Sequence, residues 1–291
     1  MRNKTSSLYS YTLTYPALLL YTLFFVVPVA AGIVMAFTDW QSTRILEPAF
    51  NGLDNFRALF NDERFMKSLT NTLWFASITM ILKVVFGLPL AVALDKPLKT
   101  RGYLRTIFFF PGILSAVVIG IMFTSLFQMD GVVDRFLNFF GIPTGVNWLG
   151  QGNTAMAVVM LTDVWQWTGL TMIIFLAGLQ GIPGDYYEAS TIDGASAYRQ
   201  FRHITLPLLA PSFTIIFTLS LIGGLKVFAN VYVLTNGGPG FSTQVLATYI
   251  YQAFGSGLLG LSSAMGLVLT VLVTVLTLLL NGYLRRKELE L

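Results

Sequence analysis

The chain has 291 residues, of which 55% are hydrophobic and only 11% charged, with a formal net charge of +4. Soluble domains carry about a quarter charged residues, so this composition, with a mean hydropathy of +0.69, indicates an integral membrane protein. The sequence contains no cysteine, which excludes disulfides, thiolate metal sites and cysteine nucleophiles.

Six apolar runs predict six membrane-spanning helices in a single all-α domain of residues 1–291. They cover 15–38, 72–94, 107–128, 155–178, 213–235 and 264–284. Each run is long enough to cross a bilayer, which takes about 20 apolar residues. The first run follows two basic residues, as the core of a signal peptide does. Because it is too long for a cleaved segment, we interpret it as a retained first span.

The basic residues are distributed unevenly about these six spans. Eleven of the eighteen lysines and arginines fall on one side, at Arg2, Lys4, Lys96, Lys99, Arg101, Arg105, Arg199, Arg202, Arg285, Arg286 and Lys287. Five fall on the other side, at Arg44, Arg57, Arg64, Lys67 and Arg135. Short cytoplasmic loops carry the excess of positive charge. The sequence therefore predicts that both termini are cytoplasmic.

Three ionisable residues, Lys83, Asp163 and Lys226, fall inside predicted spans. Such residues are costly in a bilayer and commonly mark a transport pathway. Asp163 and Lys226 both lie roughly 12–14 Å below the outer boundary at 1.5 Å per residue. They are therefore expected either to form an ion pair or to face one cavity, unless both are ordinary structural polar groups. Lys83 has no role that the sequence assigns.

Aromatic and polar residues accompany these charges in the fourth and fifth spans. Trp165, Gln166 and Trp167 stand beside Asp163, and Asn230 follows Lys226. Sugars offer apolar C–H faces to aromatic rings and hydroxyl groups to polar side chains. This grouping is typical of a sugar pathway, although tryptophans also anchor spans at the membrane surface.

A charged segment at about 185–211 separates the fourth and fifth spans, and we term it the cassette. Its sequence from Tyr187 to Pro211, YEASTIDGASAYRQFRHITLPLLAP, predicts two short helices bounded by prolines. Tyr198, Phe201, Ile204 and Leu208 fall on one helical stripe, which is expected to face the spans. The cassette is then either an interfacial helix or an element that docks into another protein.

The cassette resembles the EAA loop of permeases from ATP-binding-cassette importers. Glu188, Ala189, Gly194, Ile204, Leu206 and Pro207 match the family pattern, and Ser190 stands where a second alanine is usual. In that family the loop forms coupling helices that sit in a cleft of the cytoplasmic ATPase. The resemblance implies an ATPase-coupling role for Glu188, Ala189, Ser190, Asp193, Gly194, Arg199, Phe201, Ile204, Leu206 and Pro207.

Nearly the whole chain resembles the carbohydrate-importer subfamily that includes the maltose F-type subunit. PALLLYTLFFVVPVAAGIVMAFTDW and LTNGGPGFSTQVLATYIYQAF are its most specific segments. The resemblance implies the type I importer permease fold with six transmembrane helices. It also places Trp167, Leu170, Ser220, Gly224 and Val227 near sugar-lining positions, of which only Ser220 keeps a polar side chain of the expected kind. Whether this chain or a partner permease makes the main sugar contacts stays open.

The chain lacks the G-x-x-x-x-G-K-[ST] loop that cradles ATP phosphates. The resemblance implies that ATP and magnesium bind a separate cytoplasmic ATPase dimer. It further implies a second homologous permease, an extracellular solute-binding protein or lipoprotein, and a bacterial plasma membrane. No cofactor, metal site or nucleic-acid partner is predicted for this chain. Catalysis is disfavoured because the only histidine, His203, lies in the cassette. The alternatives are an importer of a non-sugar solute such as glycerol phosphate, or an ion-coupled secondary transporter that uses Asp163.

Overall fold

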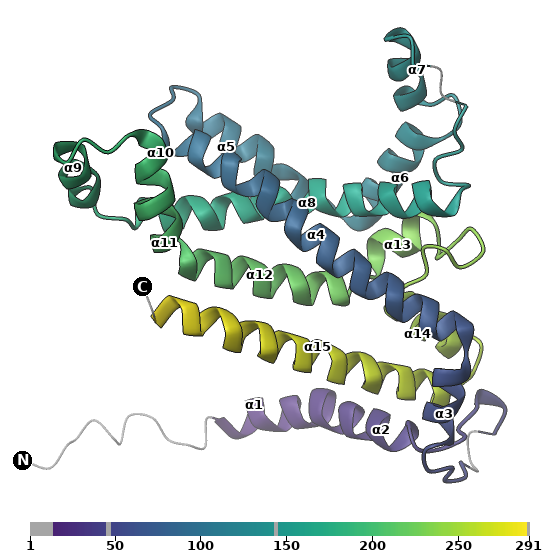
Figure 1. Ribbon diagram of the computed structural model, residues 1–291. Coiled ribbons are helices and arrows are strands. Elements are labelled where there is room, and N and C mark those ends of the chain that lie inside the picture. Colours follow the sequence, from purple (N-terminus) through teal and green to yellow (C-terminus); the bar gives the residue numbers. More distant parts are fainter. Residues whose placement is uncertain (1–13, 45–47, 143–144, 290–291) are drawn as a thin grey trace, which may run out of the picture. The chain divides into compact units, whose positions relative to one another are not determined.

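The computed structural model describes residues 14–44, 48–142 and 145–289, and within them the regular elements are helices (Figure 1). The helical fold expected from the sequence is confirmed. Contacts divide the chain into two compact units, each described by itself below. Unit 1 comprises Met1–Asp62 and Ile250–Val268, and unit 2 comprises Glu63–Tyr249 and Leu269–Leu291. The single domain expected from the sequence stays a prediction.

Unit 1 begins with the first predicted span. It holds α1 (Thr14–Tyr21), η3 (Thr22–Val26), α2 (Val27–Met35), η4 (Ser42–Arg44) and α3 (Asp54–Asn61). The run from α1 to α2 is apolar and buries none of its side chains, as expected of a helix surrounded by lipid. The loop after α2 is closed by Asn55, whose buried Nδ2 donates to the carbonyls of Ala36 at 2.9 Å and Thr38 at 2.8 Å.

Unit 2 contains the remaining elements. They are α4 (Glu63–Asp95), α5 (Arg101–Phe109), η5 (Phe110–Ile113), α6 (Ala116–Phe127), α7 (Val132–Phe139), α8 (Gly152–Gln180), α9 (Asp185–Ile192), α10 (Ala197–Gln200), η6 (Phe201–Thr205), α11 (Leu206–Leu208), α12 (Ala210–Leu225) and α13 (Ala229–Leu234). Two further helices, α14 (Leu246–Gly255) and α15 (Leu259–Leu289), contribute residues to both units.

The helices α4 and α8 pack along each other and form the centre of unit 2. One core cluster joins Ala91 of α4 to Met172 and Phe175 of α8 and Ile216 of α12. This burial of apolar side chains fixes α8 against its neighbours, and α8 carries most of the residues predicted for the pathway.

The third predicted span, 107–128, is not one helix. Phe109 ends α5, a 3₁₀ turn follows through Pro111, and α6 starts again at Ala116. Proline has no amide hydrogen to continue the helix. The hydroxyl of Ser115 then accepts from the amide of Val118 at 3.3 Å, which caps the new helix. Hydropathy missed this break because every residue around it is apolar or small.

The fifth predicted span, 213–235, is also interrupted. The helix α12 ends at Leu225, directly after two glycines, and the chain resumes helical geometry at Ala229. Glycine is a poor helix former, and Phe228 has φ −134° and ψ −60°, outside helical geometry. At its other end α12 bends by 62° from the helical segment Ala197–Leu208.

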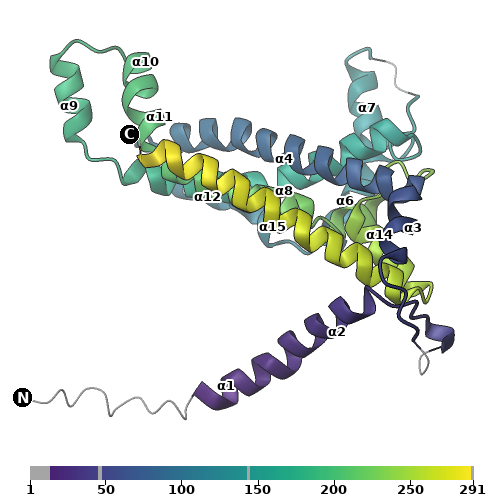
Figure 2. The same ribbon diagram turned by 60° about the horizontal axis from the view of Figure 1, so that its bottom comes forward.

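Among the described residues, five helices are long and apolar enough to cross a membrane, and the bent pair around Leu209 brings the number to six. Within unit 2, the cassette, the Asp95 end of α4 and the C-terminal end of α15 lie at the same end of the bundle in both views (Figures 1 and 2). Of the basic residues predicted to be cytoplasmic in unit 2, Arg199 and Arg202 belong to the cassette and Arg285 and Arg286 to the end of α15. Lys96 and Lys99 directly follow α4, and Arg101 and Arg105 lie in α5.

Gly169 of α8 sits where a side chain has no room. A Cβ at this position would overlap the backbone carbonyl oxygen of Phe108, which cannot rotate away as a flexible side chain would. We expect Gly169→Ala to destabilise the protein by about 1–3 kcal/mol, measured as a lower melting temperature of the detergent-purified chain. Gly282→Ala is the matched control, since nothing lies within 4 Å of its added Cβ. Equal melting temperatures would contradict the close packing.

Candidate functional site

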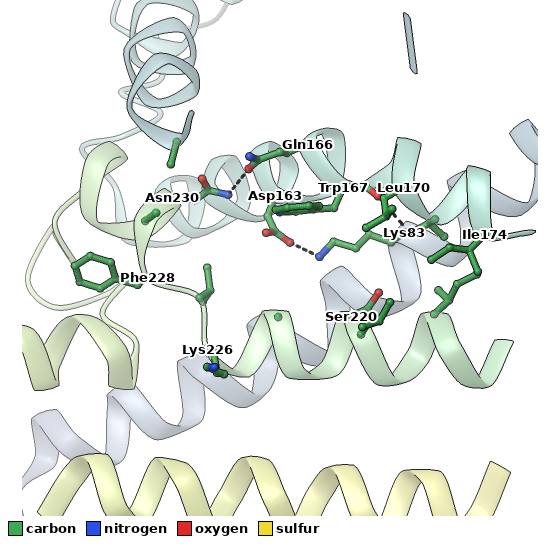
Figure 3. A pocket seen from close by; sticks show the side chains of 17 residues that line it. Lys83, Asp163, Gln166, Trp167, Leu170, Ile174, Ser220, Lys226, Phe228 and Asn230 are labelled. Carbon is green, nitrogen blue, oxygen red and sulfur yellow. Dashed lines mark hydrogen bonds and ion pairs between the residues drawn. The ribbon is translucent and has the colours of Figure 1, made fainter. Parts of the chain in front are cut away.

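A cavity of about 500 Å³ lies in unit 2 between α8, α12 and the start of α13 (Figure 3). Eight of the ten residues predicted for the pathway line it, and the lining comes from opposite sides of the cavity. They are Asp163, Gln166, Trp167, Leu170, Ser220, Lys226, Val227 and Asn230. The spacing of three or four residues between Asp163, Gln166 or Trp167, and Leu170 places them on one face of α8. Ser220 lies in α12, Lys226 and Val227 directly follow that helix, and Asn230 lies in α13.

Two predicted pathway residues, Trp165 and Gly224, are absent from this lining. Trp165 instead packs on Phe123 of α6, with ring centroids 5.3 Å apart. A Cβ added to Gly224 would lie 2.7 Å from the Cα of Ala76 on α4. Gly224 therefore permits close contact between α12 and α4.

Lys83 of α4 forms a buried ion pair with Asp163 of α8 at the wall of the cavity. Its Nζ lies 2.6 Å from Asp163 Oδ2, and the two side chains are 4% and 7% exposed. Of the two arrangements expected for Asp163 and Lys226, the structure has them facing one cavity, with the ion pair made to Lys83. A pair so placed neutralises both charges and holds α4 against α8 beside the cavity.

A second polar link crosses the cavity wall. Buried Asn230 donates from Nδ2 to Gln166 Oε1 at 3.1 Å, and both side chains are 5% exposed. Since Asn230 is near the start of α13, this bond fastens the helix that follows the break to α8. The break itself places Phe228 and Ala229 in the lining, which the sequence did not indicate.

The remaining lining combines aromatic and aliphatic surface with the hydroxyl groups of Thr171 and Ser220. Trp167 and Phe228 supply rings, Leu170 and Ile174 supply apolar surface, and Ser220 presents its hydroxyl group. Such a wall can stack on the C–H faces of a polar solute and also bond its hydroxyl groups. Among the described residues, no group of three or more His, Asp and Glu side chains could hold a metal ion.

The cassette forms two helical pieces joined at Gly194, as expected. Gly194 adopts φ +74°, a conformation that side-chain-bearing residues rarely adopt. Gln200 of α10 donates from Nε2 to the hydroxyls of Ser190 and Thr191 of α9, at 3.0 Å each. Tyr187 and Thr205 join their hydroxyl groups at 2.9 Å. These bonds clamp α9 to the segment that enters α12.

The structure corrects part of the predicted apolar stripe. Tyr198 is 76% exposed and Leu208 is 42% exposed, while Phe201 and Ile204 are half-buried. The four residues do not share one face because η6 is a π-helical turn. Such a turn rotates the residues after Gln200 about the helix axis relative to those before it.

The predicted coupling residues divide by exposure. Exposed are Glu188, Ala189, Asp193, Gly194 and Arg199; half-buried are Ser190, Phe201, Ile204, Leu206 and Pro207. Ile192, which the sequence did not single out, is 87% exposed.

Fold and cavity together define a helical membrane permease, and comparison with known proteins gives its family. The family model for the binding-protein-dependent transport system inner membrane component matches residues 83–288. The chain belongs to this family, the permeases of ATP-binding-cassette importers.

Several relatives match along nearly their full length. The chain is 36% identical over 276 residues to the arabinooligosaccharides transport system permease protein of Bacillus subtilis, covering 92% of this chain and 86% of that one. It is 31% identical over 281 residues to the multiple sugar-binding transport system permease protein of Streptococcus mutans, covering 96% of each. The crystal structure of a bacterial ABC transporter involved in the import of the acidic polysaccharide alginate matches with a TM-score of 0.83 and 25% identity, over 95% of this chain and 94% of that chain.

Proposed function

We propose that this chain is one of two permease subunits of an ATP-driven importer of a sugar or oligosaccharide. The observation that carries this proposal is the cavity, which combines Trp167 and Phe228 with Ser220, Gln166 and Asn230. Its walls suit a solute with both apolar faces and many hydroxyl groups. The similarity to an arabinooligosaccharides transport system permease and a multiple sugar-binding transport system permease supports the same solute class.

The cavity lies on the two helices that flank the cassette. The helix α8 enters the cassette and α12 leaves it, and both line the cavity. A displacement of the cassette would therefore tilt both walls around the solute. We infer that this connection converts the closing of an ATPase on ATP into opening of the pathway.

The partners follow from this arrangement. The exposed part of the cassette, with Glu188, Ile192 and Gly194, would contact a cytoplasmic ATPase dimer that holds ATP and magnesium. A second homologous permease would complete the pathway, and an extracellular solute-binding protein or lipoprotein would deliver the sugar. The uneven distribution of basic residues along the sequence supports a cytoplasmic position for the cassette and both termini. The family and its bacterial relatives support a bacterial plasma membrane location.

Purification of the C-terminally tagged chain from its native membrane tests this assembly. We expect gentle solubilisation to recover an ATPase and a second permease of similar size, and the reconstituted complex to hydrolyse ATP faster when sugar and binding protein are added. A chain that is recovered alone and transports solute in proteoliposomes without ATP would contradict the proposal and indicate an ion-coupled secondary transporter.

A further inference from the structure

The cavity carries an unbalanced positive charge. Its lining contains three charged side chains, Lys83, Asp163 and Lys226. The first two neutralise each other at 2.6 Å. Lys226 is exposed, and among the described residues the ion pairs do not include it. Two positive charges and one negative charge leave the cavity with a net charge of +1, which resides on Lys226.

The position of Lys226 is fixed by the break in the fifth span. It directly follows the last residue of α12, and its amide donates to Ile222 O at 3.1 Å. Two residues later Phe228 stacks on Tyr232, with centroids 5.1 Å apart and an interplanar angle of 16°. The short stretch that carries Lys226 is therefore held at both ends.

Charge is distributed unevenly along the cavity. Lys226 and Phe228 lie toward the broken segment, whereas Leu170 and Ile174 lie at the other end of the drawn site (Figure 3). When a solute fills the cavity, water around Lys226 is displaced. A neutral solute would leave an ammonium group without a counter-charge in a mostly apolar space, which is costly. An anionic group on the solute would remove that cost and gain a charge-assisted hydrogen bond.

We propose that the transported solute is an acidic sugar, which bears one carboxylate, sulfonate or phosphate group, and that Lys226 binds this anion. This inference rests on the proposed sugar-import function and names its solute class. The sugar ring would stack on Trp167 or Phe228 while its anion reaches Lys226. Lys83 does not serve this purpose, because Asp163 already neutralises it.

The test uses the complete importer in proteoliposomes, with its ATPase, partner permease and binding protein. The probes are the neutral sugars cellobiose and glucose, the uronic acid counterpart of the first, cellobiuronic acid, and the acidic counterparts of the second, glucose 6-phosphate and 6-sulfo-glucose. ATP hydrolysis is measured against probe concentration for wild type, Lys226→Met, Lys226→Arg and Lys67→Met. Lys67 is an exposed lysine of unit 2 outside the cavity lining, so its variant is the matched control.

We expect at least one acidic probe to stimulate wild type at a lower concentration than its neutral counterpart does. Lys226→Met should reduce that preference about tenfold, as loss of a hydrogen bond to a charged group does, while Lys226→Arg and Lys67→Met retain it. The acidic probe that works identifies which of the three anions is accepted.

Two results would overturn the inference alone. In one, cellobiose stimulates wild type and Lys226→Met leaves the ratio of acidic to neutral stimulation unchanged. In the other, Lys226→Met weakens the response to acidic and neutral probes equally, as expected if Lys226 pairs with a partner subunit or merely stabilises the end of α12. Stimulation by no probe of either kind would contradict sugar import itself and the inference with it.

Discussion

Replacing Asp163 by asparagine is expected to cost about 3–5 kcal/mol of stability, the usual effect of breaking a buried ion pair by removing one partner. The substitution barely changes side-chain volume but leaves Lys83, which is 4% exposed, as an unpaired buried cation. The measurement is thermal unfolding of the detergent-solubilised chain, followed by size-exclusion chromatography. Lys83→Met should destabilise similarly, because it leaves the carboxylate of Asp163 unpaired.

The double variant Lys83→Met with Asp163→Leu tests whether the stability depends on the ion pair as a unit or on each residue alone. Since an apolar pair of similar volume often replaces a buried ion pair without loss, we expect the double variant to unfold at a higher temperature than either single variant. Lys226→Met controls for loss of charge in the same cavity. If the effects of the single variants Lys83→Met and Asp163→Leu simply added in the double variant, the ion pair would not be the unit that joins α4 to α8.

Replacing Gly194 by valine is expected to abolish sugar-stimulated ATP hydrolysis and uptake by the assembled importer. Gly194 has φ +74°, which a β-branched residue adopts only with strain, so the turn between α9 and α10 would change shape. The fold of the chain should survive, because Gly194 is exposed and an added Cβ would meet nothing within 4 Å. Uptake in proteoliposomes and recovery of the ATPase on the tagged chain are the measurements.

Gly194→Asn is the control that keeps the backbone conformation, since asparagine adopts positive φ angles more readily than other residues with a side chain. We expect it to retain more uptake than the valine variant. Wild-type uptake by a correctly assembled Gly194→Val importer would show that the shape of the cassette does not matter for coupling.

The sequence was most informative where helical periodicity applies. Along α8, residues 163, 166, 167, 170 and 174 repeat at helical spacing and line the cavity together. The same spacing explains why Trp165, two positions from Asp163, faces α6 instead. The partner of Asp163 could not be derived this way, because Lys83 lies 80 positions earlier and only packing of α4 on α8 brings the two together.

The interruptions of the third and fifth spans were not visible in hydropathy. Apolar composition predicts that a segment lies in the membrane, but it does not report where backbone hydrogen bonding stops. Pro111 and the glycine pair before Leu225 were present in the sequence, yet glycine and proline are common inside membrane helices. For this reason the sequence could not predict that Phe228 lines the cavity, and only the structure shows it.

The side-chain clamp of the cassette has a mechanical consequence. Gln200 is hydrogen-bonded to Ser190 and Thr191, and Tyr187 is hydrogen-bonded to Thr205. The helix α9 and the segment that leads into α12 are therefore connected by side chains as well as by the main chain. Two connections deform less than one. A displacement of α9 would therefore be transmitted to α12 with little bending of the loop between them. The hydroxyl of Ser190 supplies one of these bonds, which an alanine at the same position would not make.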